Sequence, residues 1–171
     1  STREVDSWNL PKWFESSSIK VKGLVVHEFC ESPSHWSSKA SLDEWLRSEG
    51  GRGRDGVDTR ALTKRLRAHG VMLGLLQVCN ERREPNLERL VKEAENVEDP
   101  DRRDLVAEVS IREPAIFGDD GDGKRPTIVL IDCGAKASII RKLVERKLRV
   151  VKVPYDSTVD EIIEFKPDGF M

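Results

Sequence analysis

Hydrophobic residues in the last third of the chain fall into two continuous runs separated by a helical stripe. Residues 128–131 form the first run, which is typical of a strand buried on both faces. Residues 135–146 carry apolar side chains at helical spacing, and the second run lies within residues 148–156. The order strand, helix, strand predicts a βαβ unit with parallel strands.

Two more elements are predicted after this unit. Ser157 or Thr158 can cap a helix that continues through Phe165, and residues 167–171 begin a third strand. A sheet of two strands and the start of a third would leave pairing positions unfilled and one face thinly covered.

The earlier part of the chain alternates shorter strand and helix patterns. Residues 19–26 alternate apolar and polar side chains and predict a strand. Ser41 and Glu44 have the spacing of a capping box, and Gly50 ends the helix that follows them.

A strongly basic helix comes next, and Asp58 or Thr59 can cap it. Gly70 is expected to stop this helix in the left-handed conformation. Residues 71–80 predict a buried strand, and residues 86–97 predict a helix with an apolar stripe along one face.

Residues 118–125 combine glycine with charged side chains between two patterned regions, which favours a linker. We therefore predict a first domain over residues 1–117 and a second domain of which residues 126–171 form the first part. The acidic stretch of the linker is not a calcium loop, because the twelfth position counted from Asp120 is Ile131 instead of glutamate.

Composition narrows the class of protein. The chain has 171 residues, with 29 basic and 31 acidic side chains and a formal net charge of -2. The chain has no basic stripe of the kind that would indicate a nucleic-acid partner. The composition does not exclude a phosphate-rich ligand. No apolar stretch reaches the roughly 18–20 residues that cross a bilayer, and the first residues lack a secretory pattern, so we expect no membrane partner and a cytoplasmic location.

Three cysteines, Cys30, Cys79 and Cys133, lie at wide and unrelated spacings. An odd number without a C-x-x-C pair predicts neither a disulfide framework nor a metal clip. Each lies in an apolar or strand-like context, so we expect reduced thiols that pack as small hydrophobic side chains.

Cys133 is nevertheless a candidate nucleophile, because it lies between a predicted strand and a helix N-terminus, where the pKa of a thiol is lowered. A thiol nucleophile also needs a base within reach, and His27, His35 and His69 all precede the predicted linker. The flanking residues do not form a nucleophile elbow. We therefore predict a packing role for Cys133. His35 is expected to pair with the ring of Trp36 and not to bind a metal.

The turn at Cys133 and Gly134 could instead hold a phosphate at the start of the helix. It lacks the spacing of a P-loop or a dinucleotide fingerprint, so a tight turn is the favoured interpretation. The basic helix offers Arg60, Lys64, Arg65 and Arg67 to an anionic partner. A solvated helix face has the same pattern, and the sequence leaves both interpretations open.

Several stretches together resemble the small, glutamine-hydrolysing subunit of carbamoyl-phosphate synthetase. The resemblance includes IKVKGLVVHEFCESPSHWSSKASLDEWL, GVDTRALTKRLRAHGVMLG, DLVAEVS and IVLIDCGAKASIIRKLVERKLRVVKVPYDSTVDEIIEFKPDGFM. The stretch from GVDTRALT into the basic helix, and the D-x-G-x-K turn followed by VPYD, are its most specific parts. One departure lies at residues 51–55, where Arg52 and Arg54 replace apolar residues of the family pattern.

The resemblance implies an α/β protein with two domains. Residues 1–117 would be part of a swivelling β/β/α N-terminal domain, and residues 126–171 would be the first βαβα portion of a flavodoxin-like class I glutamine amidotransferase domain. The family hydrolyses glutamine with a cysteine thiol and a histidine–glutamate pair. The ammonia passes to a large subunit, on which ATP and metal are expected, for use with bicarbonate in arginine or pyrimidine biosynthesis.

By this resemblance, the catalytic thiol and the glutamine-holding loop would follow Met171, and a glutamine-contacting serine would precede Ser1. Cys133 takes the place of an aromatic residue in a D-F-G-x-K turn. The resemblance therefore implies that this segment has no catalytic, substrate-binding or metal-binding residue and is inactive alone.

Two other functions stay open from the residues. The first is a non-catalytic module that docks a large synthetase subunit, with the basic helix as its surface. The second is a free-standing nucleotide binder that uses the turn at Cys133 and Gly134.

Overall fold

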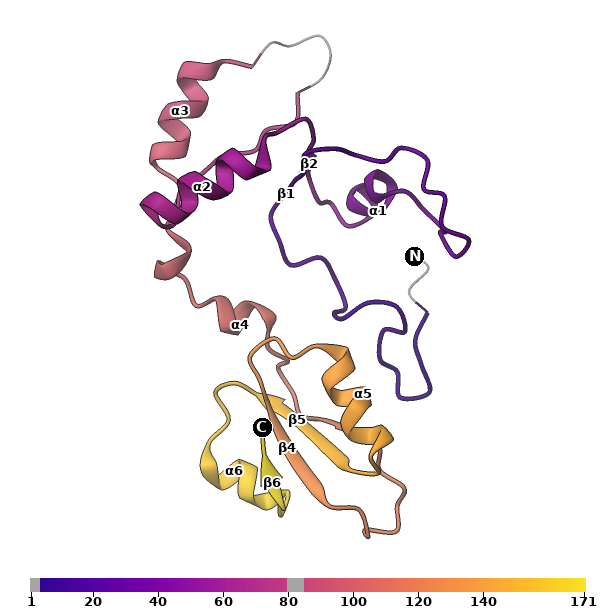
Figure 1. Ribbon diagram of the computed structural model, residues 1–171. Helices are drawn as coiled ribbons and strands as arrows, with labels where there is room; N and C mark the ends of the chain where they lie inside the picture. The colour runs from indigo at the N-terminus through magenta and orange to yellow at the C-terminus, as the bar shows by residue number, and fades with distance from the viewer. Residues whose placement is uncertain (1–3, 80–84) are drawn as a thin grey trace. The chain divides into compact units, whose positions relative to one another are not determined.

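The computed structural model describes residues 4–79 and 85–171 and has mixed α/β architecture (Figure 1). The chain divides into two compact units. The sheet unit comprises Ser1–Ser17 and Arg103–Met171, and the helical unit comprises Ser18–Arg102. The helical unit is thus an insertion between two segments of the sheet unit.

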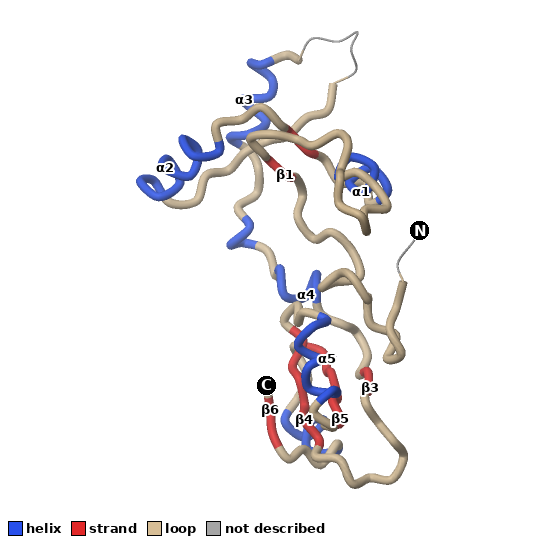
Figure 2. Tube along the Cα trace, turned by 45° about the vertical axis from the view of Figure 1, so that its right-hand side comes forward, coloured by secondary structure: helices blue, strands red, loops and turns tan. Residues whose placement is uncertain are grey.

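A four-stranded sheet with the order β3-β5-β4-β6 organises the sheet unit (Figure 2). The strands are β3 (Ala115–Phe117), β4 (Thr127–Asp132), β5 (Arg149–Pro154) and β6 (Gly169–Phe170). Strands β5 and β6 both pair with β4 in parallel. The predicted βαβ unit and the third strand are therefore confirmed.

Helices cover the two faces of this sheet. Helix α5 (Ala137–Glu145) buries Ile140 and Val144 in a cluster with Leu130 and Val150. Helix α6 (Val159–Glu164) covers the opposite face, where its Ile162 is buried in a cluster with Val129, Val151 and Val153. Neighbouring residues of a strand point to opposite faces, which is why β4 has a continuous apolar run over residues 128–131 and β5 carries Val150, Val151 and Val153. Thr158 caps α6 with a complete capping box, as one of the two predicted caps.

Strand β3 was not predicted, and it changes the role of the glycine-rich segment. It pairs antiparallel with β5, in the register Ala115 to Lys152. Residues 118–125 therefore connect β3 to β4 inside the sheet unit, whereas the compact units divide at residues 17/18 and 102/103. The pairing of β3 also fills one edge that the sequence left open.

The N-terminal segment of the sheet unit packs on α5. Leu10 is buried in the α5 cluster, with Trp8 against it. Arg141 donates to the carboxylate of Asp6 at 3.0 Å and to the carbonyl of Pro11 at 2.7 Å. Apolar burial and a partly buried ion pair therefore hold the chain start to the helix.

Three helices of the helical unit agree with the sequence. They are α1 (Leu42–Ser48), α2 (Thr59–His69) and α3 (Leu87–Glu95). Ser41 and Glu44 complete the predicted capping box, and Asp58 caps α2 by accepting from the amide of Ala61 at 2.9 Å. Gly70 ends α2 at φ 81° and ψ -150°, a glycine-favoured conformation outside the expected left-handed helical region.

The strand predictions in this unit were largely wrong. The strand expected over residues 19–26 shrinks to β1 (Leu24–Val25), which pairs in parallel with β2 (Gly53–Arg54). Residues 71–79 form no strand, and Val71 is 78% exposed. Residue 80 lies outside the described residues. An extended apolar segment needs partners for its backbone N–H and C=O groups before it can be buried, and the described part of this unit pairs only two residues on each of two strands.

The apolar stripe of α3 is also exposed, with Leu87 at 69% and Val91 at 59%. Leu46 of α1 is the one buried hydrophobic side chain among the described residues of the helical unit. A short 3-10 helix, η1 (Pro100–Arg102), ends the unit, and α4 (Leu105–Val109) follows in the sheet unit. The described chain has no helix with the length and apolar character needed to cross a membrane.

The departure at residues 51–55 does not prevent local pairing. The carbonyl of Arg52 accepts from the amide of Leu24, and that of Arg54 accepts from Val26, both at 2.9 Å. Both arginine side chains are exposed. Because β2 pairs only through its backbone, arginine is tolerated there.

Candidate functional site

A buried carboxylate, Asp132, organises the end of the central strand. It is fully buried, and the ammonium of Lys152 lies 2.8 Å from its Oδ2. The same oxygen accepts from the amide of Ile111 at 2.8 Å, while Oδ1 accepts from Gly134 at 3.1 Å and Ala135 at 2.9 Å. One side chain therefore joins β4, β5, the turn into α5 and the segment after α4.

The charge of Asp132 is stabilised by these donors. Burial alone would raise the pKa of Asp132, but the hydrogen bonds from Lys152, Ala135 and Ile111 outweigh it and lower this pKa below its ordinary value. The ion pair is consequently present at neutral pH.

Tyr155, just after β5, makes a second connection to the α4 segment. Its hydroxyl donates to the carboxylate of Asp104 at 2.8 Å, and its amide donates to the hydroxyl of Ser110 at 3.1 Å. The hydrogen bond to Asp104 raises the pKa of the Tyr155 phenol. Figure 1 shows α4 beside the ends of β4 and β5. This edge, where ligands bind in many open α/β sheets, is therefore occupied by the protein's own residues.

Cys133 lies at this edge with an exposed side chain, and Cys30 and Cys79 are exposed as well. The expectation that the cysteines pack as buried hydrophobic residues was wrong. For Cys133 the reason is register: Asp132 points into the interior, so the next side chain of the extended backbone points outward.

The three histidines have local partners in the helical unit. The Nδ1 atom of His27 is 3.2 Å from the carbonyl of Val57, and that of His69 is 3.0 Å from the carbonyl of Arg65. The Nδ1 atom of His35 contacts the hydroxyl of Ser37 at 2.8 Å. The rings of His35 and Trp36 are 5.5 Å apart, which confirms the pairing, but both side chains are exposed.

The backbone amides that could hold a phosphate at the turn are already used. The amides of Gly134 and Ala135 donate to Asp132. The amide of Ala137 donates to the carbonyl of Glu15 at 2.9 Å, and that of Ser138 donates to the carboxylate of Glu15 at 2.9 Å. Two carboxylates of the chain thus occupy the place of an anion, and this disfavours the nucleotide-binder hypothesis.

Acidification is expected to destabilise the sheet unit. Hydrogen bonds from Ser138 lower the pKa of Glu15, and the pKa values of Asp6 and Asp132 are lowered despite their burial. Such carboxylates stabilise the fold fully above their unfolded pKa values, about 3.9 for Asp and 4.3 for Glu, and lose this effect as the pH falls through the lower folded values. Amide hydrogen exchange of β4 at several pH values should therefore show faster opening in acid. Glu15→Gln should weaken that dependence, and protection that increases in acid would contradict it.

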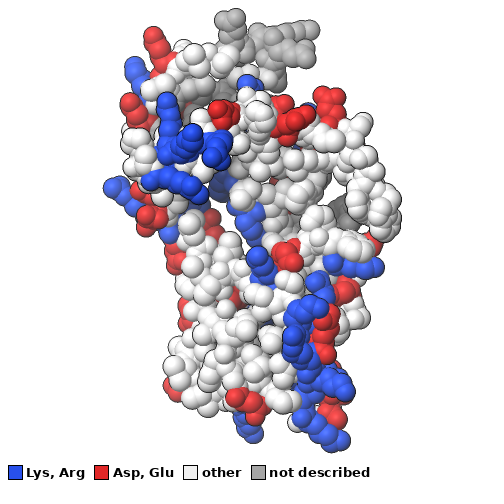
Figure 3. Space-filling model, viewed as in Figure 1, with Lys and Arg blue, Asp and Glu red and all other residues white. Residues whose placement is uncertain are grey.

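The four predicted docking residues are all exposed on α2, where Lys and Arg side chains gather (Figure 3). They do not share one face. Arg60, Lys64 and Arg67 border a shallow hollow of about 250 Å³ together with Thr59 and Thr63. Arg65 is not among the residues that line it.

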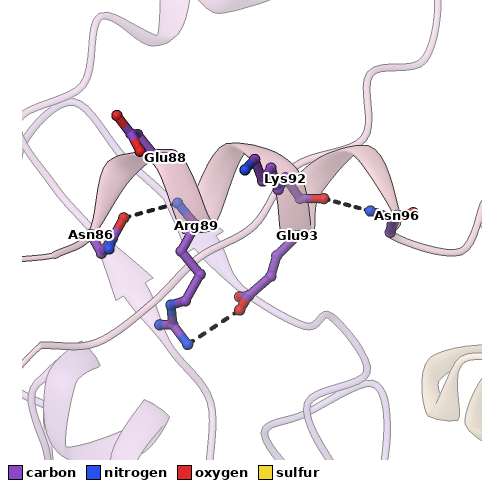
Figure 4. A pocket seen from close by; sticks show the side chains of 6 residues that line it. All are labelled: Asn86, Glu88, Arg89, Lys92, Glu93 and Asn96. Carbon is purple, nitrogen blue, oxygen red and sulfur yellow. Dashed lines mark hydrogen bonds and ion pairs between the residues drawn. The ribbon is translucent and has the colours of Figure 1, made fainter.

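A second hollow, of about 590 Å³, lies along α3 (Figure 4). Arg89 pairs with Glu93 at 3.2 Å and donates its amide to the side chain of Asn86 at 2.9 Å. Asn96 donates to the carbonyl of Lys92 at 2.7 Å. Its lining residues come from one helix and its two capping residues, and several of them pair with one another, so no second element contributes a group to this hollow.

Metal ligands do not gather within residues 4–79 and 85–171, where no group of three or more His, Cys, Asp or Glu side chains could hold an ion. In the glycine-rich segment, Asp119 pairs with Arg149, Asp120 with Arg125 and Asp122 with Lys124. Each of these three carboxylates is therefore paired with a neighbouring basic side chain.

Sequence reasoning missed Asp132, Lys152 and Glu15 as organising residues. A charged residue that directly ends an apolar strand was an available signal for Asp132, and Lys152 interrupts the next apolar run. Glu15 gave no local signal, because its partners lie more than 120 residues away.

Comparisons with known proteins show which proteins this chain resembles. Residues 8–76 match the family described as the carbamoyl-phosphate synthase small chain, CPSase domain. The carbamoyl phosphate synthase small chain of Archaeoglobus fulgidus is 42% identical over 158 residues, which cover 91% of this chain and 42% of that protein. The pyrimidine-specific small chain of Bacillus subtilis is 40% identical, over 92% of this chain and 41% of its own.

The resemblance inferred from the sequence is therefore confirmed: the chain is similar to carbamoyl-phosphate synthase small chains over about nine-tenths of its length. Similarity extends to the multifunctional protein CAD of Squalus acanthias, 41% identical over 92% of this chain and 6% of that protein. The chain spans about two-fifths of the length of the small chains it matches.

Proposed function

We propose that this chain is the central segment of a glutamine-hydrolysing carbamoyl-phosphate synthase small chain and that it provides scaffold without hydrolysing glutamine by itself. The parent protein would supply ammonia to a large chain, which uses bicarbonate and ATP and carries the metal. Its cytoplasmic location stays a prediction. The identity of about 40% to several small chains, over about nine-tenths of the chain, supports this assignment.

The proposed domains are those of the family. Residues 1–117 would belong to the swivelling N-terminal domain, residues 118–125 to a connection, and residues 126–171 to the start of a flavodoxin-like amidotransferase domain. The parallel strands β4, β5 and β6 with helices on both faces are in keeping with the second assignment.

The predicted inactivity rests on the surroundings of Cys133. The carboxylate of the neighbouring Asp132 is paired with Lys152 and accepts hydrogen bonds from backbone amides, so it is not free to act as a base. The histidines make their hydrogen bonds within the helical unit. Within the described part of the sheet unit, the exposed thiol of Cys133 has no hydrogen bond to a base, and a thiol that lacks a base is a poor nucleophile for an amide.

Incubation of the purified chain with glutamine should therefore release no ammonia above buffer. An assay coupled to glutamate dehydrogenase measures the released ammonia. Cys133→Ser should leave this baseline unchanged. A glutaminase rate that disappears in the serine variant would refute the proposal.

A second candidate function is docking to the large chain. It is favoured by α2, whose basic residues are exposed and make no ion pair in the described structure. A docking module should form a complex with a purified carbamoyl phosphate synthase large chain, detectable by size-exclusion chromatography. The absence of a complex at micromolar concentrations would argue against this function.

A further inference from the structure

We propose that Arg60, Lys64 and Arg67 form one binding face of α2 that accepts an acidic polypeptide segment of a partner protein, and that Arg65 takes no part in it. The proposal rests on the docking function above and specifies its surface and the chemistry of its partner. We call these three residues the α2 cationic face.

Helical geometry separates the cationic face from Arg65. Residues 60, 64 and 67 follow the spacing i, i+4 and i+7, which places them along one stripe of a helix. Arg65 is rotated by about 100° from Lys64, because each residue turns the helix by that angle. The hollow described above has the same grouping, since it is lined by the three residues of the face and by Thr59 and Thr63.

The cationic face differs from α1, α3 and α5 in having no ion-pair partner among the described residues. Helix α1 pairs Arg47 with Asp43 at 2.7 Å, α3 pairs Arg89 with Glu93, and α5 pairs Lys142 with Glu145 at 2.7 Å. Across the described ranges, no carboxylate lies within 4.0 Å of any basic side chain of α2. The helix itself contains no acidic residue. Its positive charge is therefore available to another molecule.

The spacing of the charges indicates the kind of partner. Residues 60 and 67 are about 10 Å apart along the axis, from a rise of about 1.5 Å per residue. A row of this length matches carboxylates at i, i+4 and i+7 on a second helix better than one compact phosphate. A nucleic acid would require a longer basic stripe, and the net charge of the chain is -2. An acidic helical segment is thus the best complement.

The test uses the full chain and a fluorescent helical peptide with glutamate at positions i, i+4 and i+7. The same peptide with glutamine at these positions is the ligand control. Fluorescence anisotropy at low salt, where screening is weak, should detect binding of the glutamate peptide and much weaker binding of the glutamine peptide. Lys64→Glu should raise the Kd by roughly fivefold or more, from a lost attraction and a new repulsion.

Arg65→Glu is the matched control, because it makes the same change of charge on the same helix outside the face. It should change the Kd less than about twofold. Lys64→Gln should produce a smaller loss than Lys64→Glu and gives a second measurement if the reversal disturbs folding, which circular dichroism would detect. Equal losses for Lys64→Glu and Arg65→Glu would overturn the proposal, as would equal binding of the two peptides.

Competitors separate the other ligand classes. Inorganic phosphate that displaces the peptide beyond the effect of equal ionic strength would indicate a point-anion site and overturn the proposal. A single-stranded oligonucleotide that binds more tightly than the peptide, and is lost in Lys64→Glu, would overturn it too. Complex formation with the large chain that survives Lys64→Glu would reject the cationic face but leave docking intact. Peptide binding without a large-chain complex would support the face and reject the proposed docking.

Discussion

Replacing Asp132 by alanine should lower the free energy of unfolding of the sheet unit by about 3–5 kcal/mol, the cost of breaking a buried ion pair from one side. The change would leave Lys152, whose side chain is 14% exposed, without its counter-charge. It would also remove the acceptor of the amides of Ile111, Gly134 and Ala135. Chemical denaturation measures the loss of unfolding free energy, and hydrogen exchange of the β4 and β5 amides shows whether the loss lies in the sheet unit.

A double-mutant cycle tests whether the ion pair is the cause. Lys152→Met alone should also destabilise the sheet unit, because it leaves a buried carboxylate without its cation. The combination Asp132→Ala and Lys152→Met should cost less than the sum of the two single changes. Strict additivity would mean that Asp132 acts only through the backbone amides.

Gly118→Ala is expected to have the next largest effect, although the residue lies in the segment predicted as a linker. Gly118 has φ 69°, and an added Cβ would lie 2.8 Å from both the carbonyl oxygen of Leu148 and a methyl group of Val144. The left-handed conformation costs a non-glycine residue about 1–2 kcal/mol, and crowding of a packed site adds about 1–3 kcal/mol. The same denaturation measurement on the sheet unit would detect this loss.

Gly121→Ala is the matched control in the same segment. Gly121 has φ 75°, but nothing lies within 4 Å of its added Cβ. Only the conformational cost of about 1–2 kcal/mol should then appear. A loss for Gly118→Ala no greater than that for Gly121→Ala would show that the backbone of Leu148 does not hold this position.

The sequence was most informative where a signal was local or repeated. The capping box of α1 depends on residues three positions apart and formed as expected, and Thr158, one of the two predicted caps, caps α6. The continuous apolar runs of β4 and β5 indicated strands covered on both faces, which is how they are buried. The motifs of the family were also readable, because they are contiguous in the chain.

The predictions failed where burial needed a partner distant in the chain. Residues 71–79 form an apolar run like that of β4, yet all but the half-buried Leu76 stay exposed, because the described part of the helical unit offers them no neighbouring strand. β3 was overlooked because its three residues become a strand only through pairing with β5. The exposure of Cys133 likewise follows from the inward direction of the Asp132 side chain, which the fold decides.

The amino-acid pattern by itself therefore determined the resemblance to carbamoyl-phosphate synthase small chains, the order of elements from β4 to β6 and the basic character of α2, since each depends on residues close together in the chain. Tertiary structure alone decided the use of individual side chains. It placed Lys152 against Asp132 and Glu15 against the start of α5, and it left Arg60, Lys64 and Arg67 without acidic partners in the described chain. Pairing of charges depends on distance in space, which no local spacing in the chain encodes.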